Sequence, residues 1–262
     1  MKTYRETLWL RRLVALSLLT AVWEILAQLK LINPFYVPPP SEISRVVYSL
    51  FSEGLILSHL QATFTAALLG LVLGVALGIA LGFAAALVPP VADLLEPIML
   101  LLNAIPRVIL APLFVIWLGI DLASKIALAV VLVAVLIFFA VYSGIKDVNQ
   151  LFVDRVRTLG GGRWVLLREV YIPSVTAWVL GSLKVAVGFA FTGACVGEFV
   201  AATRGLGYLL QFAQSTYNAA LTIGLILLIM IFVLLLFTGA EALERRLLRW
   251  RYRGAGQPAA NP

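Results

Sequence analysis

The chain has 262 residues, of which 62% are hydrophobic and only 13% are charged, and its mean hydropathy is +1.01. About a quarter of the residues in an average soluble domain are charged, so this composition excludes an ordinary soluble domain and indicates a polytopic membrane protein. The single cysteine, Cys195, excludes a disulfide within the chain, and the single histidine, His59, excludes a histidine-rich metal site.

The chain begins with a basic segment, residues 1–12, followed by an apolar run over residues 13–29. A cleaved signal peptide is the alternative interpretation, but Glu24 interrupts the run and no clear small-x-small cleavage site follows. We therefore expect a first membrane span here. After a proline-rich stretch, residues 41–53 predict an amphipathic helix on the membrane surface. Its apolar face carries Ile43, Val46, Val47, Leu50 and Phe51.

The second predicted span, residues 60–88, has a small residue at every fourth position. Such a stripe lets helix backbones approach closely in lipid, where close packing replaces the hydrophobic driving force. The stripe fits either packing within one subunit or an interface between subunits. Its members are Ala62, Ala66, Gly70, Gly74, Gly78, Gly82 and Ala86.

The remaining predicted spans are residues 93–119, 122–145, 174–200 and 219–240, and a basic tail follows over 241–262. The third span contains three prolines together with Asn103 and Arg107. Membrane helices tolerate proline where neighbours or water satisfy the freed carbonyls, so we expect a kinked helix that lines a pathway. The fifth span contains Lys184 and Glu198, which complete a candidate pathway set.

The segment 146–173 is the most charged internal part of the chain. Helical spacing in residues 155–159, three successive glycines from Gly160, a second helical pattern from Arg163 and a closing Pro173 predict a helix, a turn, a second helix and a stop. Its apolar stripe and basic face suit docking onto a partner outside the bilayer.

Lysine and arginine are concentrated in the segments that six spans place on one side. Fourteen of the 20 lysines and arginines lie in the N-terminal segment, the 146–173 loop and the tail. The positive-inside bias therefore places both termini and this loop in the cytoplasm. The net charge of +7 then needs no nucleic acid to explain it.

The chain contains no phosphate-binding G-x-x-x-x-G-K-[ST] motif and no protease or hydrolase signature. We therefore expect no catalytic residues, no metal site and no cofactor on this chain. If transport is active, its energy arrives from a partner at the cytoplasmic face.

Residues 154–173 resemble the EAA loop of inner-membrane permease subunits of bacterial ABC importers. Asp154-Arg155-Val156 stands at the Glu-Ala-Ala positions, Gly160 at the glycine, and Ile172-Pro173 at the closing hydrophobic-proline pair. The flanks resemble the nitrate, sulfonate, taurine and bicarbonate branch. Further matches are Ala104-Ile105-Pro106, Ala111-Pro112-Leu113, Trp117-Leu118-Gly119, Ser124-Lys125-Ile126, Gly197-Glu198-Phe199 and Gly205-Leu206-Gly207-Tyr208.

The resemblance implies an all-α permease of the type I importer kind in a bacterial inner membrane, with a core over residues 60–240. Implied partners are a cytosolic ATPase dimer that uses ATP and Mg²⁺, a second permease copy in a homodimer, a soluble or lipid-anchored binding protein, and membrane lipid. The residues implied to contact the ATPase are Asp154, Arg155, Arg157, Leu159, Gly160, Arg163, Trp164 and Pro173.

A small anion is the expected substrate, and a pyrimidine or vitamin precursor or an aromatic acid is the alternative within the same class. Lys184 lies about 16 Å along a helix from Pro173, near mid-membrane, so Lys184 and Arg107 favour anions if both face the pore. Alternatively, Lys184 reaches lipid head groups and Arg107 pairs with Glu198. From other classes, an ion-coupled secondary transporter or a non-transporting membrane anchor also fits the spans.

Overall fold

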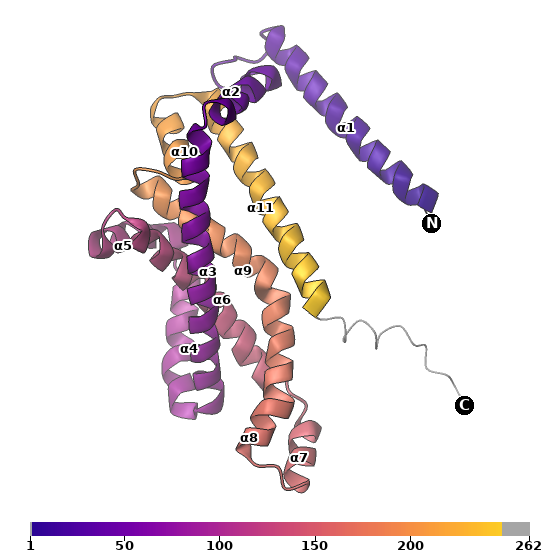
Figure 1. Cartoon of the computed structure of the whole chain (residues 1–262), viewed down its shortest axis with the longest axis vertical. Helices are drawn as coiled ribbons and strands as arrows, with labels where there is room; N and C mark the ends of the chain where they lie inside the picture. Colours follow the sequence, from indigo (N-terminus) through magenta and orange to yellow (C-terminus); the bar gives the residue numbers. More distant parts are fainter. Residues whose placement is uncertain (1, 248–262) are drawn as a thin grey trace.

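The computed structural model describes residues 2–247, except for the side chains of residues 2–9, 107, 243–245 and 247. All elements within this part are helical (Figure 1). Four helices there are long and apolar enough to cross a membrane: α3 (Leu55–Leu87), α6 (Leu122–Lys146), the continuous helical stretch Arg163–Val200, and α11 (Ala219–Leu247) over its residues 219–242. These four correspond to the predicted second, fourth, fifth and sixth spans.

Helix α6 occupies the centre of the molecule, and α3 and α9 (Ile172–Val200) pack along it. The glycines of the small-residue stripe face α6. A Cβ added to Gly74 would lie 2.6 Å from Val133 Cβ, and one added to Gly82 would lie 2.7 Å from Val141 Cβ. The stripe therefore serves close packing of α3 on α6 within the subunit, which decides between the two interpretations that the sequence leaves open.

Helix α9 approaches α6 through glycine in the same way. A Cβ at Gly193 would lie 2.6 Å from Ala129 Cα, and one at Gly197 would lie 3.2 Å from Lys125 Cα. The main-chain surfaces of the three helices are thus nearly in contact. Branched side chains of α6, including Val133, Ile137 and Val141, fill the spaces between them and are fully buried.

The predicted third span is not one kinked helix. It consists of α4 (Pro89–Ala104), a 3-10 turn (Arg107–Ile109) and α5 (Leu110–Leu118). Ile105 has extended backbone angles, φ −69° and ψ 132°, because Pro106 disfavours the helical conformation in the residue before it. Proline thus breaks this segment instead of bending it.

The N-terminal helices lie at the periphery of the bundle. Helix α1 (Lys2–Gln28) leans away from it, and α2 (Pro40–Ser52) packs against α11 (Figure 1). The hydroxyl of Ser41 donates a 2.8 Å hydrogen bond to Glu24, which joins α2 to α1. Leu13, Leu16 and Leu19 are exposed on α1, so the described residues leave much of its apolar surface uncovered.

The glycine contacts can be tested with two substitutions that add the same methyl group. Gly78→Ala would place its Cβ 2.7 Å from the backbone oxygen of Ala134, whereas Gly181→Ala meets nothing within 4 Å. We expect Gly78→Ala to destabilise the purified subunit by about 1–3 kcal/mol, as overpacking does, and Gly181→Ala to be neutral or slightly stabilising. Thermal denaturation in detergent measures both; equal melting temperatures would contradict the packing described.

Candidate functional site

A helical hairpin projects from the end of the bundle that lies opposite α2 (Figure 1). Its first arm is α7 (Gln150–Thr158), which begins where the Asn149 side chain accepts a 2.9 Å hydrogen bond from Leu151 N. The arm ends in a glycine turn, in which Gly160 has φ +80° and Gly161 N donates to Val156 O over 2.8 Å. Glycine is favoured at Gly160 because side chains resist positive φ.

The second arm passes into the membrane helix without a stop. Helix α8 (Arg163–Leu166) continues through a π-helical turn, Leu167–Tyr171, directly into α9. The expected break at Pro173 is therefore absent. Pro173 occupies the first turn of α9, and the wider π-turn just before it is a local adjustment by which helices accommodate proline. The hairpin is thus joined to α9 by helix, without an intervening loop.

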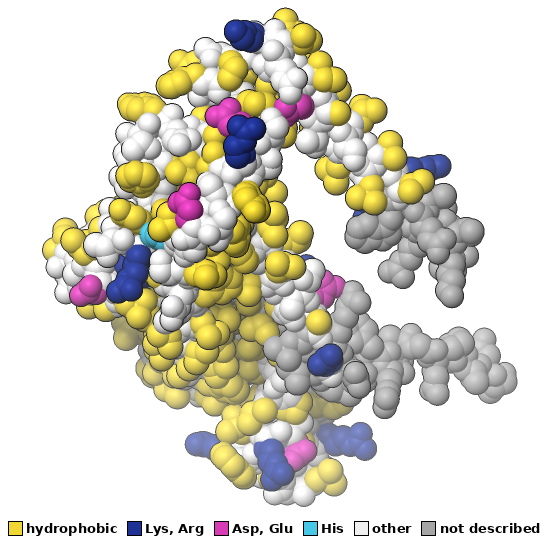
Figure 2. All heavy atoms as spheres, turned by 45° about the horizontal axis from the view of Figure 1, so that its top comes forward, with side chains coloured by type: hydrophobic (Ala, Val, Ile, Leu, Met, Phe, Trp, Pro, Cys, Tyr) yellow, Lys and Arg dark blue, Asp and Glu magenta, His cyan; other side chains and the backbone are white. Residues whose placement is uncertain are grey.

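The outer surface of the hairpin combines exposed apolar side chains with arginines. Leu159 is 80% exposed and Trp164 is 72% exposed, and at the lower end of Figure 2 Lys and Arg side chains surround hydrophobic ones. Seven of the eight predicted coupling residues lie in this hairpin, and Pro173 lies just beyond it in α9. Leu151 and Phe152, which the sequence analysis did not select, are 73% and 59% exposed on α7.

Inside the hairpin, apolar contacts fix the two arms against one another. Val153 and Leu166 are buried, and a Cβ added to Gly161 would lie 2.5 Å from Val156 Cγ1. Among the described residues 150–171, the one ion pair joins Arg168 Nε to Glu169 Oε1 at 3.7 Å in the π-turn; it is highly exposed and contributes little. The other arginines therefore remain available to acidic groups of a partner.

At the opposite end of the bundle, buried polar groups fasten the short helix α10 (Leu206–Ser215) to α3 and α9. Thr63 Oγ1 and Gly207 N both donate to Glu198 Oε2, over 2.8 and 3.0 Å. Leu206 N donates to Thr63 Oγ1 over 2.8 Å, and Gly205 N donates to His59 Nδ1 over 3.0 Å. We call His59, Thr63, Glu198, Gly205 and Gly207 the α10 latch.

The predicted pathway residues do not form one cluster. Glu198 is 1% exposed within the α10 latch, whereas Lys184 lies 3.6 Å from Glu241. These two residues are separated by about 21 Å along α9, at 1.5 Å per residue. Asn103 lies near the end of α4, and Arg107 begins the 3-10 turn, but its side chain lies outside the described ones.

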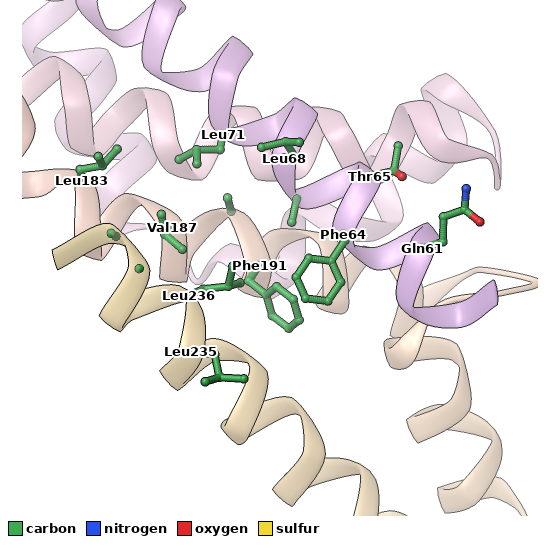
Figure 3. Close-up of a pocket in the computed structure, with 14 residues that line it drawn as sticks. Gln61, Phe64, Thr65, Leu68, Leu71, Leu183, Val187, Phe191, Leu235 and Leu236 are labelled. Atoms are coloured by element: carbon green, nitrogen blue, oxygen red, sulfur yellow. The ribbon is translucent and has the colours of Figure 1, made fainter. Parts of the chain in front are cut away.

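A cavity of about 660 Å³ lies between α3, α9 and α11 (Figure 3). Phe64, Leu68, Val187, Phe191 and Leu235 line it, and Gln61 and Thr65 supply polar groups at one end. None of the lining side chains carries a charge, and none is among the predicted pathway residues. This cavity suits an apolar occupant and has no group that would select an anion.

Comparisons with known proteins identify the family and the fold of the chain. Residues 70–249 match the family model described as "Binding-protein-dependent transport system inner membrane component". The taurine transport system permease protein TauC of Escherichia coli is 32% identical over 90% of this chain and 87% of that protein. The riboflavin transport system permease protein RibX of Chloroflexus aurantiacus is 35% identical over 90% and 88%. An amino acid ABC transporter crystallised with histidines has a TM-score of 0.62 at 17% identity, covering 76% of this chain and 97% of that chain.

The α10 latch predicts a specific loss of stability. Thr63→Val leaves the buried Leu206 amide without its acceptor and removes one of the two hydrogen bonds that Glu198 Oε2 accepts, a change that costs about 1–3 kcal/mol. Thr192→Val is the matched control, because Thr192 is exposed and bonds only within its own helix. We expect a lower melting temperature for Thr63→Val alone; no difference between the two variants would show that the latch does not stabilise the fold.

Proposed function

The chain belongs to the family of binding-protein-dependent transport system inner membrane components and is a multi-pass permease subunit of an ABC importer. On that premise, we propose that two copies of the chain form a pathway for a small anion, and that a cytosolic ATPase dimer drives the transport. The α7–α8 hairpin is the observation that supports coupling of the permease to the ATPase. It presents apolar side chains among arginines at one end of the bundle and continues into α9.

The ATPase docks on the outer surface of the hairpin. Leu159 and Trp164 enter an apolar groove, and Arg155, Arg157 and Arg163 pair with acidic residues around its rim. Exposed large apolar side chains in a ring of charge are typical of a protein interface. ATP hydrolysis takes place in the partner, since this chain carries no phosphate-binding loop.

The second copy and the lipid cover the apolar surface that one subunit leaves open. Helix α1 exposes leucines along its length, and burying such a surface against a second copy is the usual route to a closed symmetric dimer. A binding protein delivers substrate to the face opposite the hairpin, while the hairpin and both termini lie in the cytoplasm.

Among substrates, a sulfonate such as taurine is the first candidate, because the similarity to the taurine permease protein spans 90% of the chain. Asn103, Arg107, Lys184 and Glu198 remain the proposed pathway residues. A vitamin such as riboflavin is the second candidate, favoured by the equally long similarity to the riboflavin permease protein. Uptake of labelled taurine and of riboflavin into proteoliposomes holding the complete importer discriminates between them.

Removing one apolar side chain from the hairpin tests the docking surface. We expect Trp164→Ala to weaken ATPase co-purification and to lower uptake about tenfold or more, the size typical of a central aromatic contact. Trp117→Ala is the control, since Trp117 is 66% exposed on α5 and not in the hairpin. Normal ATPase binding and uptake by Trp164→Ala would contradict docking at this surface.

The orientation of the subunit in the membrane is tested by labelling single cysteines in a Cys195→Ala background. Gln150→Cys begins α7, and Thr203→Cys lies in the loop between α9 and α10, at the other end of the bundle. In intact cells an impermeant maleimide should label the cysteine at position 203 and not the one at 150, and cell lysis should make both reactive. The reverse pattern would place the hairpin outside the cytoplasm.

A further inference from the structure

A second cavity, of about 390 Å³, lies at the end of the bundle opposite the hairpin. It is formed by the first turns of α3, the start of α6 and the loop that joins α9 to α10. At this end of the bundle, Figure 2 shows the single histidine near Lys, Arg and acidic side chains. The polar groups that line the cavity are Ser58, Gln61, Thr65, Asp121, Lys125, Thr203 and Arg204.

Lys125 is the unusual member of this set. Its side chain is 6% exposed, yet it lines the cavity, and no carboxylate among the described residues lies within 4.0 Å of its ammonium. Glu198 and Asp121 are the acidic groups that attract it from a greater distance. One oxygen of Glu198 accepts bonds from Thr63 and Gly207 in the α10 latch, and its other oxygen is buried with no hydrogen-bond partner among the described residues. A buried ammonium without a close counter-ion is costly, and an anion in the cavity would offset that cost.

The backbone adds to the positive potential of the cavity. Helix α6 begins at Leu122, and the Asp121 side chain does not cap its first amides. Ile120, Asp121 and Leu122 all line the cavity, so the positive end of a 25-residue helix opens onto it. Arg204, in the loop between α9 and α10, is exposed and also lines the cavity, and Asp121 is the only acidic residue in the lining.

We propose that this cavity, hereafter the outer cavity, binds the oxyanion group of the transported substrate, such as a sulfonate, before it enters the pathway. Lys125 and Arg204 neutralise the anion, and the hydroxyl and amide groups of Ser58, Gln61 and Thr203 orient it by hydrogen bonds. Gln61 and Thr65 also line the large apolar cavity, so an organic group attached to the anion has an adjoining apolar surface. This assignment rests on the proposed import of a small anion.

The phosphate of a lipid head group is also an oxyanion that would fit these groups, so the test distinguishes a lipid from a transported substrate. The permease–ATPase complex is placed in phosphatidylcholine nanodiscs with Thr203→Cys in a Cys195→Ala background. Reaction rates are measured with an anionic and a cationic methanethiosulfonate, and their ratio is normalised to that of a free thiol. Taurine and sulfate are then added as competitors, and the experiment is repeated with phosphatidylglycerol.

We expect the anionic reagent to be favoured and the ratio to fall roughly 25-fold in Lys125→Gln, because one unit charge at contact distance in water changes each rate about fivefold, in opposite directions for the two reagents. Arg204→Gln, at an exposed position that tolerates change, should lower the ratio as well. Arg45→Gln is the control, because Arg45 is an exposed cation of α2 outside the cavity lining. Taurine or sulfate should slow the anionic reagent in the wild-type background and not in Lys125→Gln.

An unchanged ratio in both cavity variants would overturn the proposal, as would a cysteine at position 203 that reacts with neither reagent. Protection by phosphatidylglycerol without protection by taurine or sulfate would assign the cavity to lipid and overturn the substrate assignment.

Failure of the proposed function is separate: if anions protect the cysteine but the intact importer takes up no taurine, the anion site stands and the taurine proposal fails. If taurine is taken up and the ratio does not depend on Lys125, only the outer cavity is wrong.

Discussion

The close contact of α3 and α9 with α6 is the constraint on which the rest of the structure depends. In lipid, helices gain nothing from hiding apolar side chains from water, so their association relies on close packing. Glycine provides it here: the positions where Gly74, Gly82 and Gly193 lack a side chain are the positions where α6 fills the space. Because packed interiors resist deformation, α3, α6 and α9 form one stiff unit that extends through the subunit.

The unit formed by α3, α6 and α9 has a different structural feature at each end. At one end, the α7–α8 hairpin enters α9 through a helical π-turn, so the proposed docking surface is joined to the membrane helix by continuous helix. At the other end, the α10 latch ties the return helix to α3 and α9 by hydrogen bonds to Thr63 and Glu198. The outer cavity lies beside the latch and shares α3 and the loop between α9 and α10 with it. In the mechanism that we propose, movement applied at the hairpin reaches the cavity through these packed helices.

Much of this arrangement could be predicted from the sequence, because it depends on local patterns. Apolar length located the four long spans, and the three glycines together with the arginines located the hairpin. The GEF and GLGY motifs, residues 197–199 and 205–208, were recognised separately, but their contact through Glu198 and Gly207 was not foreseen. That contact joins a helix end to the next helix start and involves Thr63 from a distant span, which no local pattern encodes.

Three features were missed for physical reasons that only geometry reveals. The π-turn before Pro173 keeps the helix continuous where the residue type alone predicts a stop. Conversely, Pro106 breaks the third span into α4 and α5, although proline in a membrane helix is often accommodated as a kink. Lys125 was noted only as part of a motif; its burial and its place in the outer cavity follow from the approach of Gly197 on α9.

The stiffness of this unit can be measured by electron spin resonance between two labels in one subunit. In a mixed dimer, one copy carries spin labels at Gln150→Cys and Thr203→Cys in a Cys195→Ala background, and the other copy is unlabelled. If α3, α6 and α9 move as one body, the distance between the labels stays the same when the complete importer binds ATP, although distances between the two copies change. A shift of the distance within one copy on ATP binding would show that the unit bends, and would contradict transmission through a rigid core.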